Sequence, residues 1–201
     1  MKRAINELSV FFPAYNEEAN IEKTVLKARE VLLEFAERWE ILIIDDGSKD
    51  RTAEIADRLA SKESRIRVIH HFSNKGYGSS LRSGFYNSKF DWISFTDSDG
   101  QFDFSEIAKF TQKQAVTQAD LVVGFYLKRQ VPFYRKINTF LWETVVYLLF
   151  GFRVSDIDCG FKLISKKVIE TIPKLESERG AFISSELLIK AKKSGFKIVE
   201  M

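Results

Sequence analysis

The feature that most constrains the fold is a regular alternation of short apolar runs with longer amphipathic stretches. Largely apolar runs that end at polar turn residues occur at 8–12, 41–44, 66–69, 92–96 and 121–124. Between these runs, apolar residues recur at steps of three and four positions, which is typical of helices with one buried face. Strands that alternate with helices favour right-handed crossovers. The sequence therefore predicts an α/β fold with a mainly parallel central sheet flanked by helices on both faces.

Breakers and capping residues predict where these elements begin and end. Pro13 is expected to end the first strand, because proline has no N–H to donate to a neighbouring strand. The apolar periodicity predicts a first helix over 21–39. Ser48 or Asp50 is expected to cap the second helix, and Ser105 a later one, because short polar side chains accept bonds from free N–H groups.

Composition restricts the class of protein. The 201 residues, 45% hydrophobic and 29% charged, predict one globular domain over 1–201. The 31 Lys and Arg nearly balance the 28 Asp and Glu, so the net charge of +3 predicts no general attraction for nucleic acid. The single Cys159 and the absence of a secretory signal pattern predict a cytoplasmic location. No apolar run reaches the roughly 18 residues of a membrane-spanning helix.

Two carboxylates one residue apart follow the predicted strand over 92–96. Asp97 and Asp99, with the amide of Gln101, would bring several oxygen atoms to one strand end. Such a donor set suits a divalent cation, Mg²⁺ or Mn²⁺, that also holds waters and substrate phosphates. The alternative is an Asp-rich surface turn, because short Asp-x-Asp patterns are common in loops.

Other charged residues follow the remaining strands. Glu17, the pair Asp45 and Asp46, and Lys75 each come after a different predicted strand. Parallel strands end at one edge of the sheet, where ligands bind, so these side chains are expected to converge with Asp97. A Lys beside a metal ion that carboxylates hold is suited to binding a diphosphate and stabilising it as a leaving group. Neither a Gly-x-Gly-x-x-Gly fingerprint nor a P-loop is present, which disfavours a nicotinamide dehydrogenase and a nucleoside triphosphatase.

The stretch over 134–152 differs in composition from the rest of the chain, with bulky apolar and aromatic residues and basic flanks. It predicts a helix that lies in a membrane interface, where basic side chains meet lipid phosphates. A core or dimer-interface helix is an equal alternative. His70 and His71, which follow the third strand without a spaced partner, are interpreted as ordinary surface residues.

Five segments, in this order, carry a resemblance to a known family: Pro13–Glu18, Ile44–Thr52, Asn74–Gly78, Asp97–Gln101 and Asp158–Lys162. Together they resemble the family 2 glycosyltransferases, and within that family the dolichyl- or polyprenyl-phosphate mannose and glucose synthases. The similarity covers essentially the whole chain. It implies a GT-A nucleotide-sugar-binding domain.

The resemblance also implies roles for individual residues. The nucleotide sugar would be held by Pro13, Tyr15, Glu17, Asp45, Asp46, Lys75, Asp97 and Lys162. The metal would be held by Asp97, Asp99 and Gln101, and the catalytic residues would be Asp99, Asp158 and Arg135. The alternatives are solvated surface charges for Lys75 and Arg135 and a structural capping role for Asp158.

The family implies transfer of mannose or glucose, with inversion, from a GDP- or UDP-hexose to a polyprenyl phosphate, by a protein bound peripherally at the cytosolic membrane face. A lipid phosphate is already anionic, whereas a saccharide hydroxyl would need a general base such as Asp158. Transfer to a saccharide hydroxyl and an idle nucleotide-sugar-binding domain therefore stay as alternatives.

The chain departs from the family pattern in three places. Tyr126 stands where relatives often have Arg, and Lys162 stands where many have Arg. Relatives also continue beyond the position of Met201, so a C-terminal part of the family pattern is expected to be missing. The base, the sugar and the oligomeric state stay open.

Overall fold

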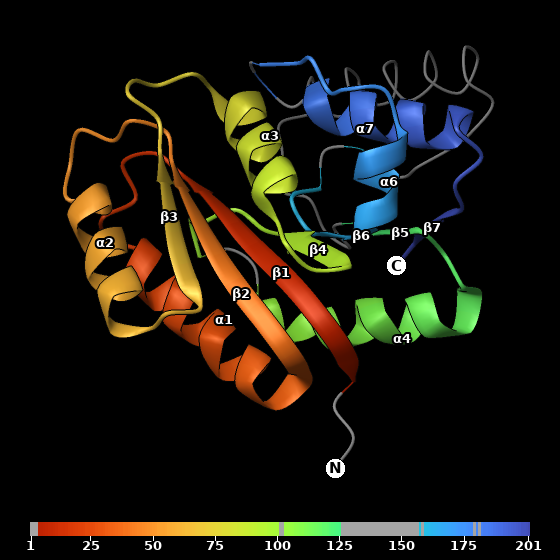
Figure 1. Ribbon diagram of the computed structural model, residues 1–201, viewed down its shortest axis with the longest axis horizontal. Helices are drawn as coiled ribbons and strands as arrows, with labels where there is room; N and C mark the ends of the chain where they lie inside the picture. The colour runs from red at the N-terminus through yellow and green to blue at the C-terminus, as the bar shows by residue number, and fades with distance from the viewer. Residues whose placement is uncertain (1–3, 101–102, 126–156, 158, 179, 181) are drawn as a thin grey trace, which may run out of the picture.

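The computed structural model describes residues 4–100, 103–125, 157, 159–178, 180 and 182–201. Its centre is a seven-stranded sheet with the strand order β3-β2-β1-β4-β6-β5-β7 (Figure 1). The strands are β1 Ile5–Ala14, β2 Ala36–Asp45, β3 Ile66–His70, β4 Trp92–Phe95, β5 Leu121–Val123, β6 Lys162–Ser165 and β7 Ile198–Glu200. The described pairs are parallel except those of β6, which is antiparallel to both β4 and β5. The predicted α/β fold with a mainly parallel sheet is confirmed.

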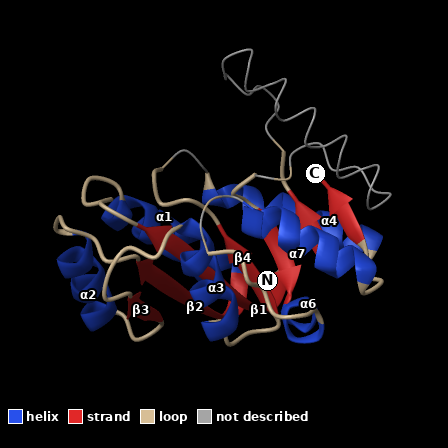
Figure 2. Cartoon of the chain, turned by 90° about the horizontal axis from the view of Figure 1, so that it is seen from above, coloured by secondary structure: helices blue, strands red, loops and turns tan. Residues whose placement is uncertain are grey.

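Helices cover both faces of the sheet (Figure 2). The helices are α1 Ile21–Phe35, α2 Thr52–Lys62, α3 Tyr77–Asn87, α4 Ile107–Thr117, α6 Lys166–Thr171 and α7 Phe182–Lys193, with a 3₁₀ turn, η1, at Phe104–Glu106. Helices α1, α2 and α4 pack on one face, and α3, α6 and α7 pack on the other. None of the helices in the described ranges is long and apolar enough to cross a membrane.

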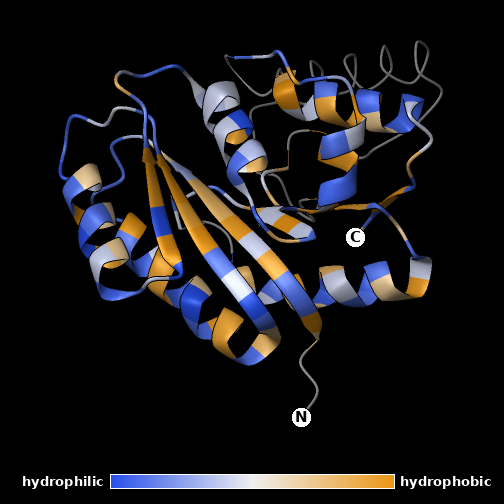
Figure 3. Cartoon of the chain, viewed as in Figure 1, coloured by the Kyte–Doolittle hydropathy of each residue, from blue (hydrophilic) through white to orange (hydrophobic). Residues whose placement is uncertain are grey.

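The central strands are buried on both faces. Along β1, Val10 and Phe12 belong to the core under α1, whereas Phe11 packs under α3 against Phe85 and Phe95, with ring centroids 5.1 Å away from each. Figure 3 shows largely hydrophobic central strands beside helices with mixed faces. Burial of both faces explains why these strands read as continuous apolar runs.

The first strand does not end at Pro13, as the sequence predicted, but continues to Ala14. In a strand, the N–H and C=O of one residue point to the same side. The Pro13 carbonyl accepts a bond from the Ser98 hydroxyl, on the side where pairing with β4 has already ended at Phe11 and Phe95. The missing N–H of Pro13 therefore faces no strand partner.

The first helix is shorter than predicted. It ends at Phe35, and Trp39 lies in β2, because parallel pairing of β1 with β2 begins at Ile5 and Ala36. Trp39 continues the helical spacing by coincidence, and sheet pairing overrides that local pattern.

The predicted caps are partly wrong. Asp103, not Ser105, is the capping residue of η1, and its carboxylate accepts a bond from the Ser105 N–H. The N-cap of α2 is Arg51, whose side chain makes no capping bond. The Asp50 carboxylate, one position earlier, accepts bonds from the N–H and the hydroxyl of Thr52, and Ser48 accepts a bond from the Asn16 N–H. The predicted helix over 134–152 lies outside the described residues.

Candidate active site

A cavity of about 460 Å³ opens at the carboxyl ends of β1 and β4, beside the N-terminus of α3. The predicted site residues that line it are Pro13, Tyr15, Glu17, Asp46, Asp97 and Asp99. Asn74, Gly76 and Tyr77 complete one wall. The prediction that polar groups after different strands converge at one edge is thus confirmed for these residues.

The loop after β1 is fixed by hydrogen bonds to the turn after β2. Asn16 adopts a left-handed backbone with φ 56°, which asparagine tolerates better than most residues. Its N–H donates to the Ser48 hydroxyl at 3.0 Å, and its side-chain oxygen accepts from the Lys49 N–H at 2.8 Å. The Glu17 N–H donates to the Thr52 hydroxyl at 2.7 Å. These bonds hold Tyr15 and Glu17 at the cavity.

Asp46 is a buried carboxylate that organises the next loop. Its Oδ1 accepts from the Lys75 N–H at 2.9 Å, and its Oδ2 accepts from the Gly76 N–H at 2.8 Å. The His71 Nδ1 lies 2.6 Å from Oδ1. A carboxylate offers about four acceptor positions, so these three donors leave about one for a ligand.

The loop after β4 is anchored at its middle residue. The buried Ser98 donates its hydroxyl to the Pro13 carbonyl at 2.8 Å, and its own carbonyl accepts from the Thr24 hydroxyl at 3.2 Å. The residues on either side, Asp97 and Asp99, both line the cavity. An anchored centre with a carboxylate on each side explains how this short sequence presents two acids to one space.

Asp97 lies in an environment that disfavours its charge. Burial raises the pKa of Asp97 above its ordinary value; the Tyr77 hydroxyl, donating to Oδ1 at 2.8 Å, and the charge of Lys162 oppose this effect, while the charges of Asp99 and Glu17 add to it. The raised pKa means that burial, together with the two neighbouring carboxylates, outweighs the stabilisation that Tyr77 and Lys162 give to the charged form.

This donor set fits a divalent cation. Within the described ranges, no three His, Cys, Asp or Glu side chains come close enough together to enclose a metal ion by themselves. Asp97 and Asp99 would therefore supply part of a coordination shell and leave positions for phosphate oxygens and water, as Mg²⁺ commonly requires. Gln101, the third predicted ligand, lies outside the described residues.

Lys162 is fully buried in β6, not exposed at an open phosphate site. Its Nζ donates to the Cys159 carbonyl and lies 5.5 Å from the centre of the Phe95 ring. Its charge lowers the pKa of Asp97, so the two groups are electrostatically linked. The predicted role of Lys162 in binding the nucleotide sugar stays a prediction.

Other predicted residues lie apart from the cavity or cannot be placed. Asp45 accepts from the Ser48 N–H at 3.0 Å and lies 2.9 Å from His70, so it stabilises the turn after β2. Lys75 contributes its backbone N–H to Asp46, and its side chain does not line the described cavity. The predicted catalytic residues Arg135 and Asp158 lie outside the described residues.

The histidines differ from the sequence interpretation. His70 is on the surface, as predicted, between the carboxylates of Asp45 and Asp57. Burial alone would lower the pKa of His70, but its bonds to these two carboxylates outweigh that effect and raise it. His71 is buried instead of exposed, and it contacts Asp46.

Sequence reasoning assigned no role to His71 or to Tyr77. Both follow β3, the same kind of position that pointed to Asp46 and Asp97. That positional signal was available for them as well.

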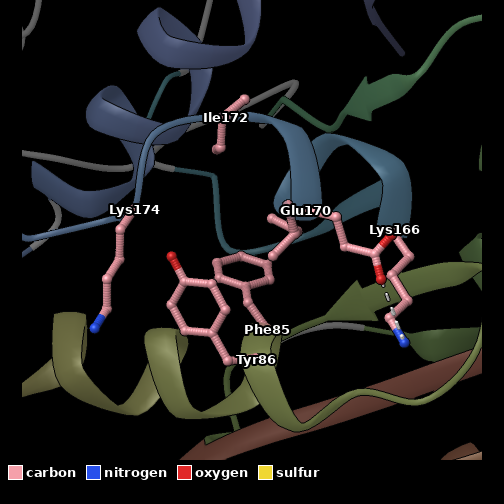
Figure 4. Close-up of a pocket in the computed structure, with 7 residues that line it drawn as sticks. Phe85, Tyr86, Lys166, Glu170, Ile172 and Lys174 are labelled. Atoms are coloured by element: carbon pink, nitrogen blue, oxygen red, sulfur yellow. Dashed lines mark ion pairs between the residues drawn. The ribbon is translucent and has the colours of Figure 1, made fainter.

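A second cavity, of about 420 Å³, lies at the other end of α3 against α6 (Figure 4). Two of its polar side chains bond to the protein: the Tyr86 hydroxyl accepts from the Leu175 N–H at 2.9 Å, and Lys166 donates to the Lys89 carbonyl at 3.1 Å. None of the residues predicted for the site lines it. The first cavity is therefore the candidate active site.

Comparison with known proteins connects this geometry to a family. Residues 9–172 match the family model described as Glycosyl transferase family 2. The glycosyltransferase AglD of Haloferax volcanii is 30% identical over 200 residues, which is 96% of this chain and 32% of that protein. The dolichyl-phosphate beta-glucosyltransferase of Saccharomyces cerevisiae is 30% identical over 221 residues, covering 96% of this chain and 65% of that protein. The chain thus spans about a third of the first relative and just under two thirds of the second.

Solved structures agree on the fold. Glucosyl-3-phosphoglycerate synthase from Mycobacterium tuberculosis, crystallised with Mn²⁺, UDP and glucosyl-3-phosphoglycerate, superposes with a TM-score of 0.72 at 21% identity, covering 97% of this chain and 69% of that chain. The fold is that of the GT-A glycosyltransferases, as the sequence resemblance implied. The family match over most of the length shows that this chain belongs to glycosyl transferase family 2.

Proposed function

We propose that the protein transfers glucose from UDP-glucose to a polyprenyl phosphate. The observation that carries this proposal is the cavity in which Asp46, with about one acceptor position left, lies across from the acidic pair Asp97 and Asp99. In this proposal, Asp46 and the loop from Pro13 to Glu17 bind the nucleoside, and the acidic pair holds the cation that neutralises the diphosphate.

The geometry of Asp46 supports uracil over guanine. Uracil has one ring N–H, which needs one acceptor, whereas guanine presents a ring N–H and an adjacent amino group that pair best with both oxygens of a carboxylate. Because three of about four acceptor positions of Asp46 accept bonds from His71, Lys75 and Gly76, a second bond from a base is disfavoured. The solved neighbour that holds UDP with Mn²⁺ is consistent with this preference.

The choice of glucose and of a lipid acceptor rests on relatives. Proteins named dolichyl-phosphate beta-glucosyltransferase from Saccharomyces cerevisiae and Homo sapiens are 30% and 28% identical to this chain. The aromatic sequence over 134–152, with its basic flanks, supports peripheral binding at the cytosolic membrane face.

The proposed reaction is a direct displacement. A phosphate oxygen of the acceptor forms a bond to the anomeric carbon of glucose, and the bond from that carbon to UDP breaks, which inverts the configuration. An acceptor phosphate is already anionic, so the protein needs to align the reactants rather than remove a proton. A divalent cation held by Asp97 and Asp99 would neutralise the charge that develops on the diphosphate. Tyr77, which donates to Asp97, would fix the orientation of that carboxylate.

The test combines binding with transfer. Calorimetric titration with UDP and GDP, in Mn²⁺ and then in EDTA, is expected to show tighter binding of UDP that needs the metal and is lost in Asp99→Ala. Radiolabelled UDP-glucose and UDP-galactose are then compared as donors to a short polyprenyl phosphate in detergent, with an uncharged polyprenol and an oligosaccharide as control acceptors. Preference for GDP, metal-independent binding or transfer to the oligosaccharide would overturn the proposal.

A further inference from the structure

His71 joins the candidate active site to helix α3. Its ring is nearly buried, with 6% of the side chain exposed, and each ring nitrogen has a partner. Nδ1 lies 2.6 Å from Asp46 Oδ1, and Nε2 lies 2.8 Å from the Ser83 hydroxyl on α3. We infer that His71 is a positioning residue that orients Asp46 for the nucleoside.

The chemistry of the partners fixes the proton on this ring. An ionised carboxylate only accepts hydrogen bonds, so Nδ1 carries the hydrogen and donates to Asp46. In the neutral ring, Nε2 is then an acceptor, and the Ser83 hydroxyl donates to it. Both nitrogens therefore have a partner, and Nδ1 is the atom that donates to Asp46.

The donors to Asp46 come from two directions. Lys75 and Gly76 approach from the loop that begins α3, whereas His71 approaches from the end of β3. The backbone of His71 is itself fixed, because its N–H donates to the Asp45 carbonyl at 2.8 Å. With donors on two sides, the carboxylate cannot rotate without breaking a bond. Its remaining acceptor position is therefore held in one orientation at the cavity.

A purely structural role for His71 predicts something different. If the ring served only to fill space between β3 and α3, any residue of similar volume would preserve ligand binding once the protein was folded. If it orients Asp46, the outcome depends on which nitrogen is replaced. The choice of variant can therefore separate the two roles.

The matched pair of variants is His71→Asn and His71→Gln. The asparagine amide can occupy the position of Nδ1 and donate to Asp46, whereas the glutamine amide reaches the position of Nε2 and contacts Ser83. Ser83→Ala is the control that removes the helix contact alone. All three are measured by UDP calorimetry in Mn²⁺ and by thermal unfolding of the same samples.

We expect His71→Gln to weaken UDP binding about tenfold, while His71→Asn and Ser83→Ala stay within about threefold of wild type. Both His71 variants are expected to lower the melting temperature by similar amounts, because each keeps one of the two bonds. Equal UDP affinity for His71→Gln and wild type would overturn the inference, and so would an equal loss in His71→Asn. The use of UDP as the ligand rests on the proposed function. A failure of the proposed function can be told apart from a failure of this inference, because wild type itself would then not bind UDP.

Discussion

Two pairs of carboxylates stand at the ends of the strands on either side of β1, and the protein uses them in opposite ways. Asp45, the last residue of β2, and Asp46, which follows it, accept bonds from backbone N–H groups and lie beside histidines. Asp97 and Asp99, after β4, face a cavity and each other's charge. The same residue type at the ends of two strands that flank β1 thus mainly fixes loops in one place, although Asp46 also reaches the cavity, and forms an acidic pair at the cavity in the other. The difference lies in the kind of donor, because backbone N–H groups bond to Asp45 and Asp46, whereas Asp97 accepts from the Tyr77 hydroxyl.

The largest effect is expected from the acidic pair. Asp97→Asn keeps the shape of the side chain but removes the charge that a cation needs, so glucosyl transfer should fall by at least about 10³-fold. EDTA should reduce wild type to the same level. Steady-state transfer, with Mn²⁺ for the variant and with EDTA for wild type, measures the two effects. The melting temperature of Asp97→Asn should not fall, because burial and the neighbouring carboxylates disfavour the charge that the variant removes. Full activity of Asp97→Asn, or of wild type in EDTA, would show that Asp97 and Asp99 do not form a metal site that transfer requires.

The opposite pattern is expected for Asp46→Asn. An amide has one acceptor oxygen, so at least one of the donors from His71, Lys75 and Gly76 loses its partner in a buried place. The free energy of unfolding should fall by about 1–3 kcal/mol, measured by urea denaturation. Asp99→Asn is the matched control and should cost less than about 0.5 kcal/mol. Equal losses in the two variants would erase the distinction between the pairs.

Gly160 tests how closely the acidic pair is confined. An alanine Cβ there would lie 2.6 Å from Asp97 Oδ2, so the carboxylate must move. Gly160→Ala should weaken metal-dependent UDP binding about tenfold, or about 1.4 kcal/mol. Gly124→Ala, where the Cβ would meet the Phe110 ring at 3.0 Å, is a control that costs stability but leaves UDP binding unchanged. Calorimetry on both variants checks this contrast.

Glu186 on α7 resembles Asp45 and Asp46, because its carboxylate also accepts bonds from backbone N–H groups of a loop. Burial alone would raise its pKa, but bonds from Lys190 and from the N–H groups of Ser177 and Glu176 lower the pKa to about 2. A depressed folded-state pKa gives stability that is complete above the ordinary value of 4.5 and is lost as the pH falls toward 2.

The expected contribution of Glu186 is about 1 kcal/mol, because the group is partly solvated. Unfolding of wild type and Glu186→Gln, measured from pH 6 to pH 2.5, should converge at the acid end of the range. Parallel curves would show that Glu186 does not titrate with folding.

The acidic edge and the first four strands were predictable from sequence, because their signals are local. Each apolar run ends at polar residues, and the rule that parallel strands share an edge brings Glu17, Asp46 and Asp97 together. The first helix was predicted too long, because the spacing of Trp39 fits a helix while its pairing partner in β1 lies far away in sequence.

The part of the site that comes from β6 was not predictable in this way. Lys162–Ser165 is too short for a periodic signal, and its antiparallel place between β4 and β5 depends on distant partners. The burial of Lys162 depends on that placement. His71 was misread because a polar residue after a strand is usually exposed, and only the position of Ser83 and Asp46 around it shows otherwise.

The place of β6 in the sheet also determines the order in which the protein can fold. The Ser94 hydroxyl bonds to the Lys162 carbonyl across 68 positions of sequence, whereas β1 to β4 pair within the first hundred residues. Contacts between distant residues form slowly. A nascent chain that has made only β1 to β4 therefore leaves β4 as an unpaired edge, which is an aggregation hazard. Arrival of β6 covers that edge and brings Lys162 to Asp97 in the same step.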